Sequence, residues 1–437
     1  MAMSYIEGGF IMDHTEKILI SLLNLTPSSI ESIHSSVDES NRLSIFITLA
    51  RRKINCPFCG ASHLLSKGFY SRNVSVPNRA FENISVSLKV PRYKCSCGHN
   101  FSDSYSMSPF NSKVSFDSIH VIMDLLQNPR MTFSSVASQT GLSESTVTRI
   151  FDKYCTIPHI PFPEAICIDE VYTKLNDHDA KYSCIFYDFY NHTIVDVLPD
   201  RRKSFLHRYF QSFQDSKELL NVKYVCIDMY FPYKQIAQLY FKKALICVDS
   251  FHVIKHLNES LNAIRIRIMN SYDKDSTQYY LLKQWKSLLF DRSINFDNPG
   301  KFNKRLNRFI NFRQLLDLML AIHPDLKKGY ELKERYVLFN ASSSFEDAKQ
   351  HFDEIYNEFS MANIHEYEDF VITLENWKNE IINSFIIYRG RRINSSVAES
   401  MNATVSTLIF NTRGIRNSER RRKRIIFAVN KSGYSLK

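Results

Sequence analysis

Two aspartates each follow a short apolar run, a position from which acids can share metal ions. Asp169 comes after Ala-Ile-Cys-Ile, and Asp228 comes after Tyr-Val-Cys-Ile. Each run reads as a buried strand, so the two acids would emerge at strand ends. Two magnesium ions held by such acids can activate an attacking oxygen and stabilise a leaving one in phosphodiester chemistry. Taken singly, an acid in such a position is more often a strand-end cap or a surface charge.

A third acidic ligand is needed, and three residues compete for that role. Glu399 is the best candidate, in the stretch Asn-Ser-Ser-Val-Ala-Glu-Ser-Met-Asn, which we expect to form a helix at the catalytic edge of the sheet. Glu170 directly follows Asp169, so in a strand it would point to the opposite face. Asp249 ends another apolar run, and from spacing alone it is the stronger rival. The residues by themselves leave this choice open.

Four of the nine cysteines form two close pairs that could bind zinc. The pairs are Cys56 with Cys59 and Cys95 with Cys97. A glycine follows each pair and permits a tight turn, and four thiolates make a structural, tetrahedral zinc site. The second pair has a one-residue spacer, so His63 or His99 could replace one thiolate. The strand-like segment between the pairs indicates a zinc ribbon with a long hairpin.

Residues 132–151 have the pattern of a helix-turn-helix. Gly141 lies in the expected turn, and Ser143 can cap the second helix through its hydroxyl. The exposed start of that helix would meet the major groove or the phosphates of DNA. The residues expected to do so are Ser143, Ser145, Thr146, Thr148 and Arg149. The alternative is a helical hairpin that only supports a neighbouring domain.

The elements that must position these residues fall into several segments. We expect an N-terminal segment at 1–50, a zinc ribbon at 51–105, a helix-turn-helix at 112–156, a core that begins at 164–260, an all-helical insertion at 261–388, and a core helix with a basic tail at 389–437. Prolines between residues 158 and 163 make a stiff linker before the core. The fold class is therefore multidomain α+β.

Within the core, short apolar runs predict buried strands. They lie at residues 165–168, 182–187, 193–198, 224–227 and 244–248, with helices expected near 204–213 and 232–241. The insertion reads as amphipathic helices at 302–322, 326–338 and 345–359. The result is a mixed α/β sheet flanked by helices and interrupted by a helical insertion.

Composition limits the class of protein. The chain has 437 residues, 44% of them hydrophobic and 23% charged, which is typical of a folded protein. A formal charge of +11 favours a polyanionic partner. No run of 18 apolar residues and no leader pattern occurs, so we expect a cytoplasmic protein without a membrane partner. The basic residues of the last stretch include Arg413, Arg416, Arg420, Arg421 and Arg422.

Five motifs together resemble the DDE transposases of the ISL-three group of bacterial insertion sequences. The motifs are Ile168-Asp169-Glu170, Leu198-Pro-Asp-Arg-Arg202, Asp228-Met-Tyr-Phe-Pro-Tyr233, Asp249-Ser-Phe-His-Val-Ile-Lys-His-Leu257 and Ala398-Glu399-Ser-Met-Asn402. The resemblance runs along nearly the whole chain. It implies a ribonuclease H-like core in which Asp169, Asp228 and Glu399 bind magnesium or manganese. Asp249 and His252 would then have a supporting role.

The resemblance also implies a function. The expected enzyme binds the terminal inverted repeats of an insertion sequence, cuts the DNA and joins it to target DNA, as a homodimer or larger assembly near the bacterial nucleoid. The five tail arginines would grip phosphates. Two departures stand out: the shortened second cysteine pair, and Ser400-Met401 where the family more often has Gly-Leu. The alternatives are a DNA-binding regulator with an inactive core and a structure-specific nuclease.

Overall fold

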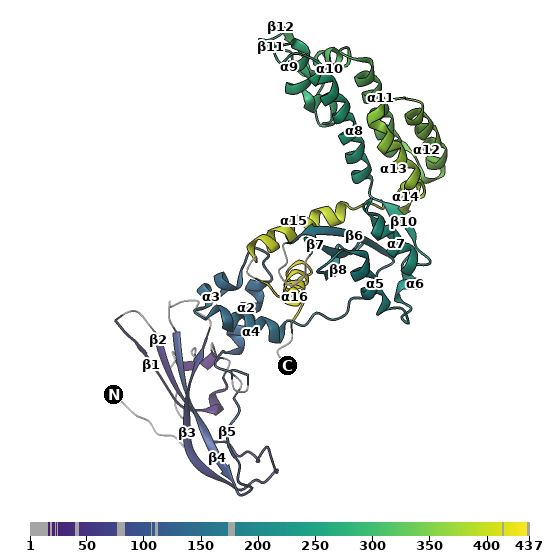
Figure 1. Ribbon diagram of the computed structural model, residues 1–437. Helices are drawn as coiled ribbons and strands as arrows, with labels where there is room; N and C mark the ends of the chain where they lie inside the picture. The colour runs from purple at the N-terminus through teal and green to yellow at the C-terminus, as the bar shows by residue number, and fades with distance from the viewer. Residues whose placement is uncertain are drawn as a thin grey trace. The chain divides into compact units, whose positions relative to one another are not determined.

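The chain forms two compact units in a computed structural model. The model describes residues 16–17, 20–21, 23, 25–39, 43–76, 84–105, 107–109, 112–173, 180–412 and 415–434. The first unit combines Met1–Pro158 with Thr407–Lys437, and the second is His159–Ser406 (Figure 1). The first division falls at the predicted proline linker. Among the described helices, none has the length and apolar character needed to cross a bilayer.

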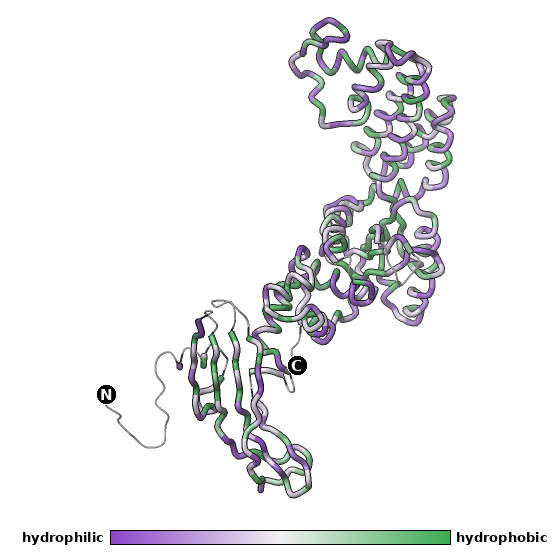
Figure 2. The backbone as a smooth tube through the Cα atoms, turned by 60° about the vertical axis from the view of Figure 1, so that its left-hand side comes forward, coloured by the Kyte–Doolittle hydropathy of each residue, from purple (hydrophilic) through white to green (hydrophobic). Residues whose placement is uncertain are grey.

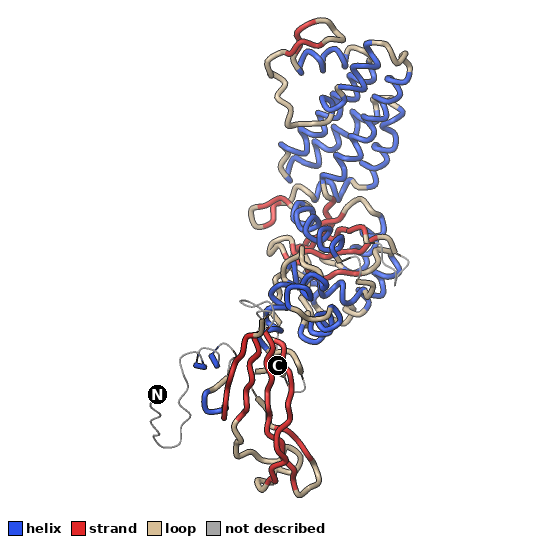
Figure 3. Tube along the Cα trace, turned by 90° about the vertical axis from the view of Figure 1, so that its left-hand side faces the viewer, coloured by secondary structure: helices blue, strands red, loops and turns tan. Residues whose placement is uncertain are grey.

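The first unit contains a five-stranded sheet (Figure 3). After the short helix η1 (Pro27–Ser29) come β1 (Ile30–Val37), β2 (Leu43–Leu49), β3 (Leu64–Ser75), β4 (Ile84–Cys95) and β5 (Asn100–Ser102), in the order β1-β2-β4-β3 with β5 beside β4. Strand β2 pairs in parallel with β4. The predicted boundary at residue 50 therefore falls inside one sheet. Apolar side chains such as Ile45 and Val86 share its core.

Helices make up the rest of the described first unit. They are α2 (Phe116–Leu126), α3 (Phe133–Thr140), α4 (Glu144–Tyr154) and α16 (Ser418–Val429). Gly141 ends α3 with a φ of 68°, a conformation that glycine adopts without strain. The Ser143 hydroxyl caps α4 by accepting from the backbone N–H of Thr146. Phe427 of α16 packs against Phe151 of α4, so the C-terminal helix belongs to this bundle.

A mixed five-stranded sheet forms the centre of the second unit. Its strands are β6 (Ala165–Tyr172), β7 (Tyr182–Asp188), β8 (Thr193–Leu198), β9 (Tyr224–Ile227) and β10 (Leu245–Val248), in the order β10-β9-β6-β7-β8. Strand β9 pairs in parallel with β6 and with β10, whereas β7 pairs antiparallel with β6 and with β8. The hydropathy colouring of Figure 2 shows apolar stretches inside this unit. The five predicted apolar runs are these five strands.

Helices contact both faces of this sheet. Successive side chains of β6 point alternately to one face and to the other. Ile166 and Ile168 share a core with α5 (Lys203–Gln211) and α7 (Phe231–Tyr240). The intervening Asp169 faces α15 (Ser396–Asn411) and hydrogen-bonds to it. The short α6 (Glu218–Asn221) leads into β9. Asp169 therefore lies on the face of the sheet that α15 contacts, opposite to the face that α5 and α7 contact.

The insertion is mainly helical. Its helices are α8 (Ser250–Asn270), α9 (Thr277–Gln284), η2 (Lys286–Leu289), α10 (Phe312–Leu320), α11 (Pro324–Ser342), α12 (Phe345–Ser360), η3 (His365–Tyr367), α13 (Glu368–Asn376) and α14 (Lys378–Asn383). A small hairpin, β11 (Lys301–Asn303) with β12 (Arg308–Ile310), interrupts them, and a second one, β13 (Ile387–Tyr388) with β14 (Arg391–Arg392), follows α14. The expectation of an all-helical insertion is therefore wrong.

The predicted helix at 302–322 is wrong in its first half. The Asn303 side chain accepts the backbone N–H groups of Arg305 and Leu306, which folds the turn between β11 and β12. Asn307 adopts a positive φ of 49° in the same turn. The helix begins only after Asn311, whose side chain caps it. Asparagine chemistry thus overrides the apolar periodicity here.

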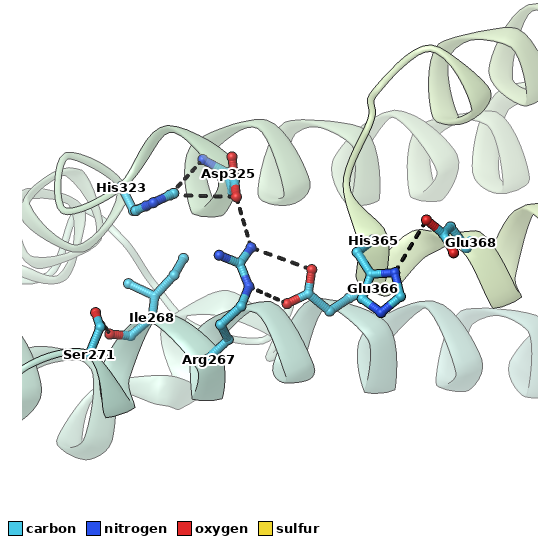
Figure 4. Close-up of polar contacts among 8 residues, drawn as sticks. All are labelled: Arg267, Ile268, Ser271, His323, Asp325, His365, Glu366 and Glu368. Atoms are coloured by element: carbon cyan, nitrogen blue, oxygen red, sulfur yellow. Dashed lines mark hydrogen bonds and ion pairs between the residues drawn. The ribbon is translucent and has the colours of Figure 1, made fainter.

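Polar and close apolar contacts join the insertion helices. Arg267 of α8 bridges Asp325 of α11 at 2.8 Å and Glu366 of η3 at 2.5 Å (Figure 4). Arg267 and Asp325 are partly exposed, so the network adds only about 1 kcal/mol per pair. Gly329 lets α11 approach α8 closely, because a Cβ there would lie 2.9 Å from Ile264 Cδ1. Apolar packing is the main source of cohesion.

Candidate active site, metal centres and DNA-binding elements

The register of the second sheet places three acids at one edge. β6 pairs in parallel with β9 through Ile168 and Ile227. Asp169 and Asp228 come one residue later, so their backbones lie about 4.8 Å apart, the usual spacing of neighbouring strands. β10 pairs in parallel with β9 in the same way and ends just before Asp249. Adjacent parallel strands therefore bring these acids together.

Asp169 is a half-buried carboxylate held by a chain of hydrogen bonds. The side-chain amide of Asn402 in α15 donates to Asp169 Oδ2 over 2.7 Å. The buried Tyr187 of β7 in turn donates its hydroxyl to Asn402. Burial raises the pKa of Asp169 to about 6, and the negative charge of Glu170 adds to the rise. The protein thus fixes the carboxylate but leaves its charge poorly stabilised.

Asp228 has a similar environment. Burial raises its pKa to about 6, and the charge of Glu170 is the next cause. The backbone N–H of Tyr230 donates to its Oδ1 over 3.1 Å, which partly opposes the rise. Among the described residues, no lysine or arginine forms an ion pair with Asp169 or Asp228. A cation bound between the two would stabilise both charged forms.

The Asp249 side chain forms hydrogen bonds at the start of two helices. It is 2% exposed, and its side chain caps α8 by accepting the backbone N–H of Phe251. Its Oδ2 accepts the hydroxyl of Ser395, the residue directly before α15. Because α15 carries Glu399, Asp249 anchors the helix of another candidate ligand.

Glu399 lies in the first turn of α15 with an exposed side chain. Partial burial raises its pKa, the charge of Asp249 raises it further, and His252 lowers it. His252 also lowers the pKa values of Asp169 and Asp228. The imidazole is therefore within electrostatic range of all three predicted ligands, and its Nε2 lies 3.8 Å from Asp249 Oδ2.

These carboxylates suit a hard divalent cation, which prefers oxygen ligands and accepts others from substrate and water. Within the described residues, the group of three or more ligand atoms that all lie within 4.8 Å of one another is the cysteine cluster. Glu399 therefore does not form so tight a group with the two aspartates. At this edge of the sheet, two aspartates are held in place and a glutamate lies on a neighbouring helix. Such a set leaves coordination positions open for substrate and water.

The four predicted zinc ligands do form a tight group. The Sγ atoms of Cys56 and Cys97 lie 3.7 Å apart, and those of Cys59 and Cys95 lie 3.5 Å apart. A tetrahedral zinc ion with bonds of about 2.3 Å requires sulfur separations of about 3.8 Å. The backbone N–H of Cys97 lowers the pKa of Cys95 to about 6, which favours the thiolate.

Neither proposed histidine substitute belongs to the tight group. His99 Nδ1 lies 3.5 Å from Cys97 Sγ, and its ring stacks on Phe58 with a centroid distance of 4.2 Å. His63 is exposed. Four thiols therefore account for a complete ligand set without either imidazole.

The helix-turn-helix presents its second helix as expected. Ser143, Ser145 and Arg149 are exposed on α4, while Thr146 and Thr148 are half-buried. The inner face of the helix, with Val147 and Ile150, is buried in the bundle. The start of α4 is thus a polar surface of hydroxyl groups with one arginine and one acid, Glu144.

Two family models match this chain. A model described as a transposase, of the ISL3 DDE type, matches residues 166–425, more than half of the chain. A second, described as the helix-turn-helix domain of transposase family ISL3, matches residues 119–155. The chain belongs to the ISL3 family of DDE transposases. No curated protein matches it. The chain is therefore a DNA-binding transposase, as the sequence motifs predicted.

The basic tail of this transposase is less exposed than expected. Both carboxylate oxygens of Asp152 accept from Arg420, and Arg424 is fully buried with its guanidinium on the carbonyls of Asn128 and Met131. Arg421 is 7% exposed and donates to the carbonyl of Ile415.

We therefore no longer expect Arg421 to contact DNA phosphates, because its guanidinium lies inside the bundle. Arg416 is exposed and Arg422 is half-buried, so both remain candidates. Arg413 lies outside the described residues. Arg420, Arg421, Arg422 and Arg424 all lie on α16, yet they differ in burial and in hydrogen-bond partners.

Two residues of the transposase site were missed by sequence reasoning. Asn402 appeared only as the end of a motif, and Tyr187 only as part of an apolar run. The signal for Asn402 was its spacing, since it lies three residues after Glu399 and so on the same side of α15. Tyr187 carries no comparable signal, because a tyrosine in a buried strand is ordinary core.

Proposed function

We propose that this transposase cuts DNA at the ends of an insertion sequence and joins the resulting 3′ ends to target DNA by metal-dependent phosphoryl transfer. The observation that carries the proposal is the position of Asp169 on β6 and of Asp228 directly after the adjacent parallel strand β9, both half-buried, both with raised pKa values and neither ion-paired among the described residues. Because neither carboxylate is ion-paired with a described lysine or arginine, a bound divalent cation would stabilise the charged form of both.

The proposed ligands are Asp169, Asp228 and Glu399, and the metal is magnesium or manganese. When bound, such ions stabilise charge on the attacking and leaving oxygens of an in-line displacement. The chain itself supplies the geometry. Asn402 and Tyr187 fix the Asp169 carboxylate, and Asp249 holds the start of the helix that bears Glu399. His252 completes this supporting set.

The sheet order β10-β9-β6-β7-β8, with two parallel and two antiparallel neighbours, supports a ribonuclease H-like assignment for the core. In the first unit we propose structural zinc on Cys56, Cys59, Cys95 and Cys97, since four protein ligands leave no position for substrate. The residues proposed to contact DNA are Ser143, Ser145, Thr146, Thr148, Arg149, Arg416, Arg420 and Arg422.

Terminal inverted repeats would be bound by the first unit and cut by the second. Two DNA ends must be brought together for joining, so we propose that the active species is a homodimer or a larger assembly.

The direct test is a magnesium-dependent cleavage and strand-transfer assay on DNA that carries the sequence flanking the gene. The wild-type protein should give joined products, and Asp228→Asn should give none while still binding the same DNA. Binding without cutting by the wild type would favour a regulator with an inactive core. Cutting of branched DNA without joining would instead indicate a structure-specific nuclease.

A further inference from the structure

A groove of about 330 Å³ lies on one side of Asp228. Besides this acid, its lining includes Arg201, Tyr230, His252 and Lys255. The histidine and the lysine come from successive turns of α8, and the arginine comes from the loop between β8 and α5. A DNA strand that approaches Asp228 from this side would meet these cations.

Arg201 is fixed within this groove by contacts on three sides. Its guanidinium carbon lies 4.4 Å from the ring centroid of Tyr182 and 4.5 Å from that of Tyr230. One of its terminal nitrogens donates to Glu170, which also accepts from Tyr233 over 3.4 Å. A guanidinium placed between two rings and tied to one carboxylate has little rotational freedom left.

This arrangement leaves hydrogen-bond donors unused. A guanidinium has five N–H donors, and Glu170 is the acceptor found for Arg201 among the described residues. The arginine side chain is 26% exposed, so part of it faces solvent. Lys255 is exposed and forms no ion pair with any described residue. Preorganised donors of this kind match the oxygens of a phosphate.

We propose that this groove binds a phosphate of the DNA strand that is cut, and that Arg201 is the residue that contacts it. Glu170 is then a positioning residue, because it orients the guanidinium without reaching the DNA. The proposal rests on the proposed function of the Asp228 site. The alternative is that Arg201 has only a structural role, the neutralisation of the Glu170 charge. The test must distinguish this role from phosphate binding.

The test uses the full-length protein and DNA ends in which single phosphates near the cut are replaced by neutral methylphosphonates. Single-turnover cleavage is compared for wild type, Arg201→Gln and Arg201→Lys, with Arg202→Gln as the matched control. The control arginine is on the same loop but is 58% exposed and bound by Asp200. It should cleave within about twofold of wild type.

For the wild type, one modified position should slow cleavage by about 10-fold or more, the loss typical of a hydrogen bond to a charged group. At that same position Arg201→Gln should lose less than about threefold further, because the contact is already absent. Arg201→Lys should fall between them, since it keeps the charge but not the fork. Additive losses at every position would overturn the proposal.

Binding provides a readout that does not need cleavage. Fluorescence anisotropy in buffer without divalent ions should show that the same methylphosphonate weakens binding to the wild type and to Arg202→Gln, but not to Arg201→Gln. If the wild type binds yet never cuts, the proposed function fails while this measurement still decides the groove. If Arg201→Gln does not fold, Arg201→Lys takes its place in both experiments, and an undiminished effect of the modification would count against the proposal.

Discussion

The cysteine cluster of the first unit and the carboxylate site of the second differ in how many ligands the fold brings together. Four thiols lie within 4.8 Å of one another. The carboxylates instead comprise two aspartates fixed on strands and a glutamate on a neighbouring helix, outside so tight a group. A structural metal needs a closed shell, whereas a catalytic metal must leave positions for substrate.

The two sites also differ in what surrounds their charges. In the cluster the thiols act on one another: a backbone N–H lowers the pKa of Cys95 to about 6, whereas hydrogen bonds with neighbouring thiols raise the pKa values of Cys59 and Cys97. At the sheet edge, burial and a neighbouring acid raise the pKa values of both Asp169 and Asp228. The thiols have a complete shell of protein ligands for a permanent cation, while the acids should bind a cation most strongly once DNA oxygens complete its shell. The predictions below test this contrast, in order of decreasing effect.

The largest effect is expected from Asp169→Asn. Removing one carboxylate charge should lower cleavage by at least ~10³-fold, because a catalytic metal supplies several kcal/mol of stabilisation to the transition state. DNA binding should stay close to wild type because the amide has nearly the same shape, and without metal at neutral pH the melting temperature should rise, because a carboxylate with a raised pKa is removed. The matched control is Asp215→Asn, at an exposed acid of the same unit outside the groove beside Asp228. Equal losses of cleavage activity in the two variants would contradict a metal-binding role for Asp169.

Cys56→Ser should break the closed site without touching the open one. We expect bound zinc to fall from one ion per chain to none and the first unit to lose several kcal/mol of stability, because structural zinc couples to folding. Metal analysis and thermal melting measure both. Cys155→Ala, at a buried cysteine outside the cluster, should keep its zinc. Retained zinc in Cys56→Ser would mean that the four thiols are not the ligand set.

Asn402→Ala tests the support of the open site. Loss of the hydrogen bond to Asp169 should lower cleavage by about 10–100-fold, as for other residues that orient a metal ligand. Tyr187→Phe should have a smaller effect in the same direction, because Asn402 would remain. Isothermal titration should show weaker manganese binding in both variants. A rate loss with unchanged metal affinity would place Asn402 in some other role.

The smallest effect concerns pH. Because the folded pKa values of Asp169 and Asp228 are raised from 3.8 to about 6, their contribution favours folding below pH 4 and is lost as pH rises through 6. Without metal, the wild type should therefore lose more stability between pH 4.5 and 7.5 than the Asp169→Asn/Asp228→Asn double variant. Thermal melting gives the comparison, and added magnesium should stabilise only the wild type. Parallel curves for the two proteins would argue against strained carboxylates.

The elements around both sites could be predicted from sequence where local patterns decide the structure. Five apolar runs became five strands, and Ser143 caps α4. Spacing also identified the cysteines that cluster and the acids at the sheet edge. These features depend on the spacing of apolar residues, on the residues that form turns and caps, and on the type of ligand residue. All three can be read from short stretches of the sequence.

Contacts between distant segments could not be predicted in the same way. Nothing local indicates that β2 pairs with β4, or that Arg424 is buried against carbonyls of the helix-turn-helix. Counting the tail arginines as exposed charge was the reason that Arg421 was misjudged. The role of Asn402 likewise appears only when α15 is packed against the sheet.

The central claim is that Asp169, Asp228 and Glu399 together bind the divalent metal, and the most direct test is manganese titration of the protein bound to its DNA end. Glu399→Gln should weaken manganese binding by at least about 100-fold, beyond the loss expected for a supporting residue, whereas Glu346→Gln, at an exposed acid of α12, should stay within about twofold of wild type. Wild-type affinity in Glu399→Gln would contradict the account and return Asp249 to the position of third ligand.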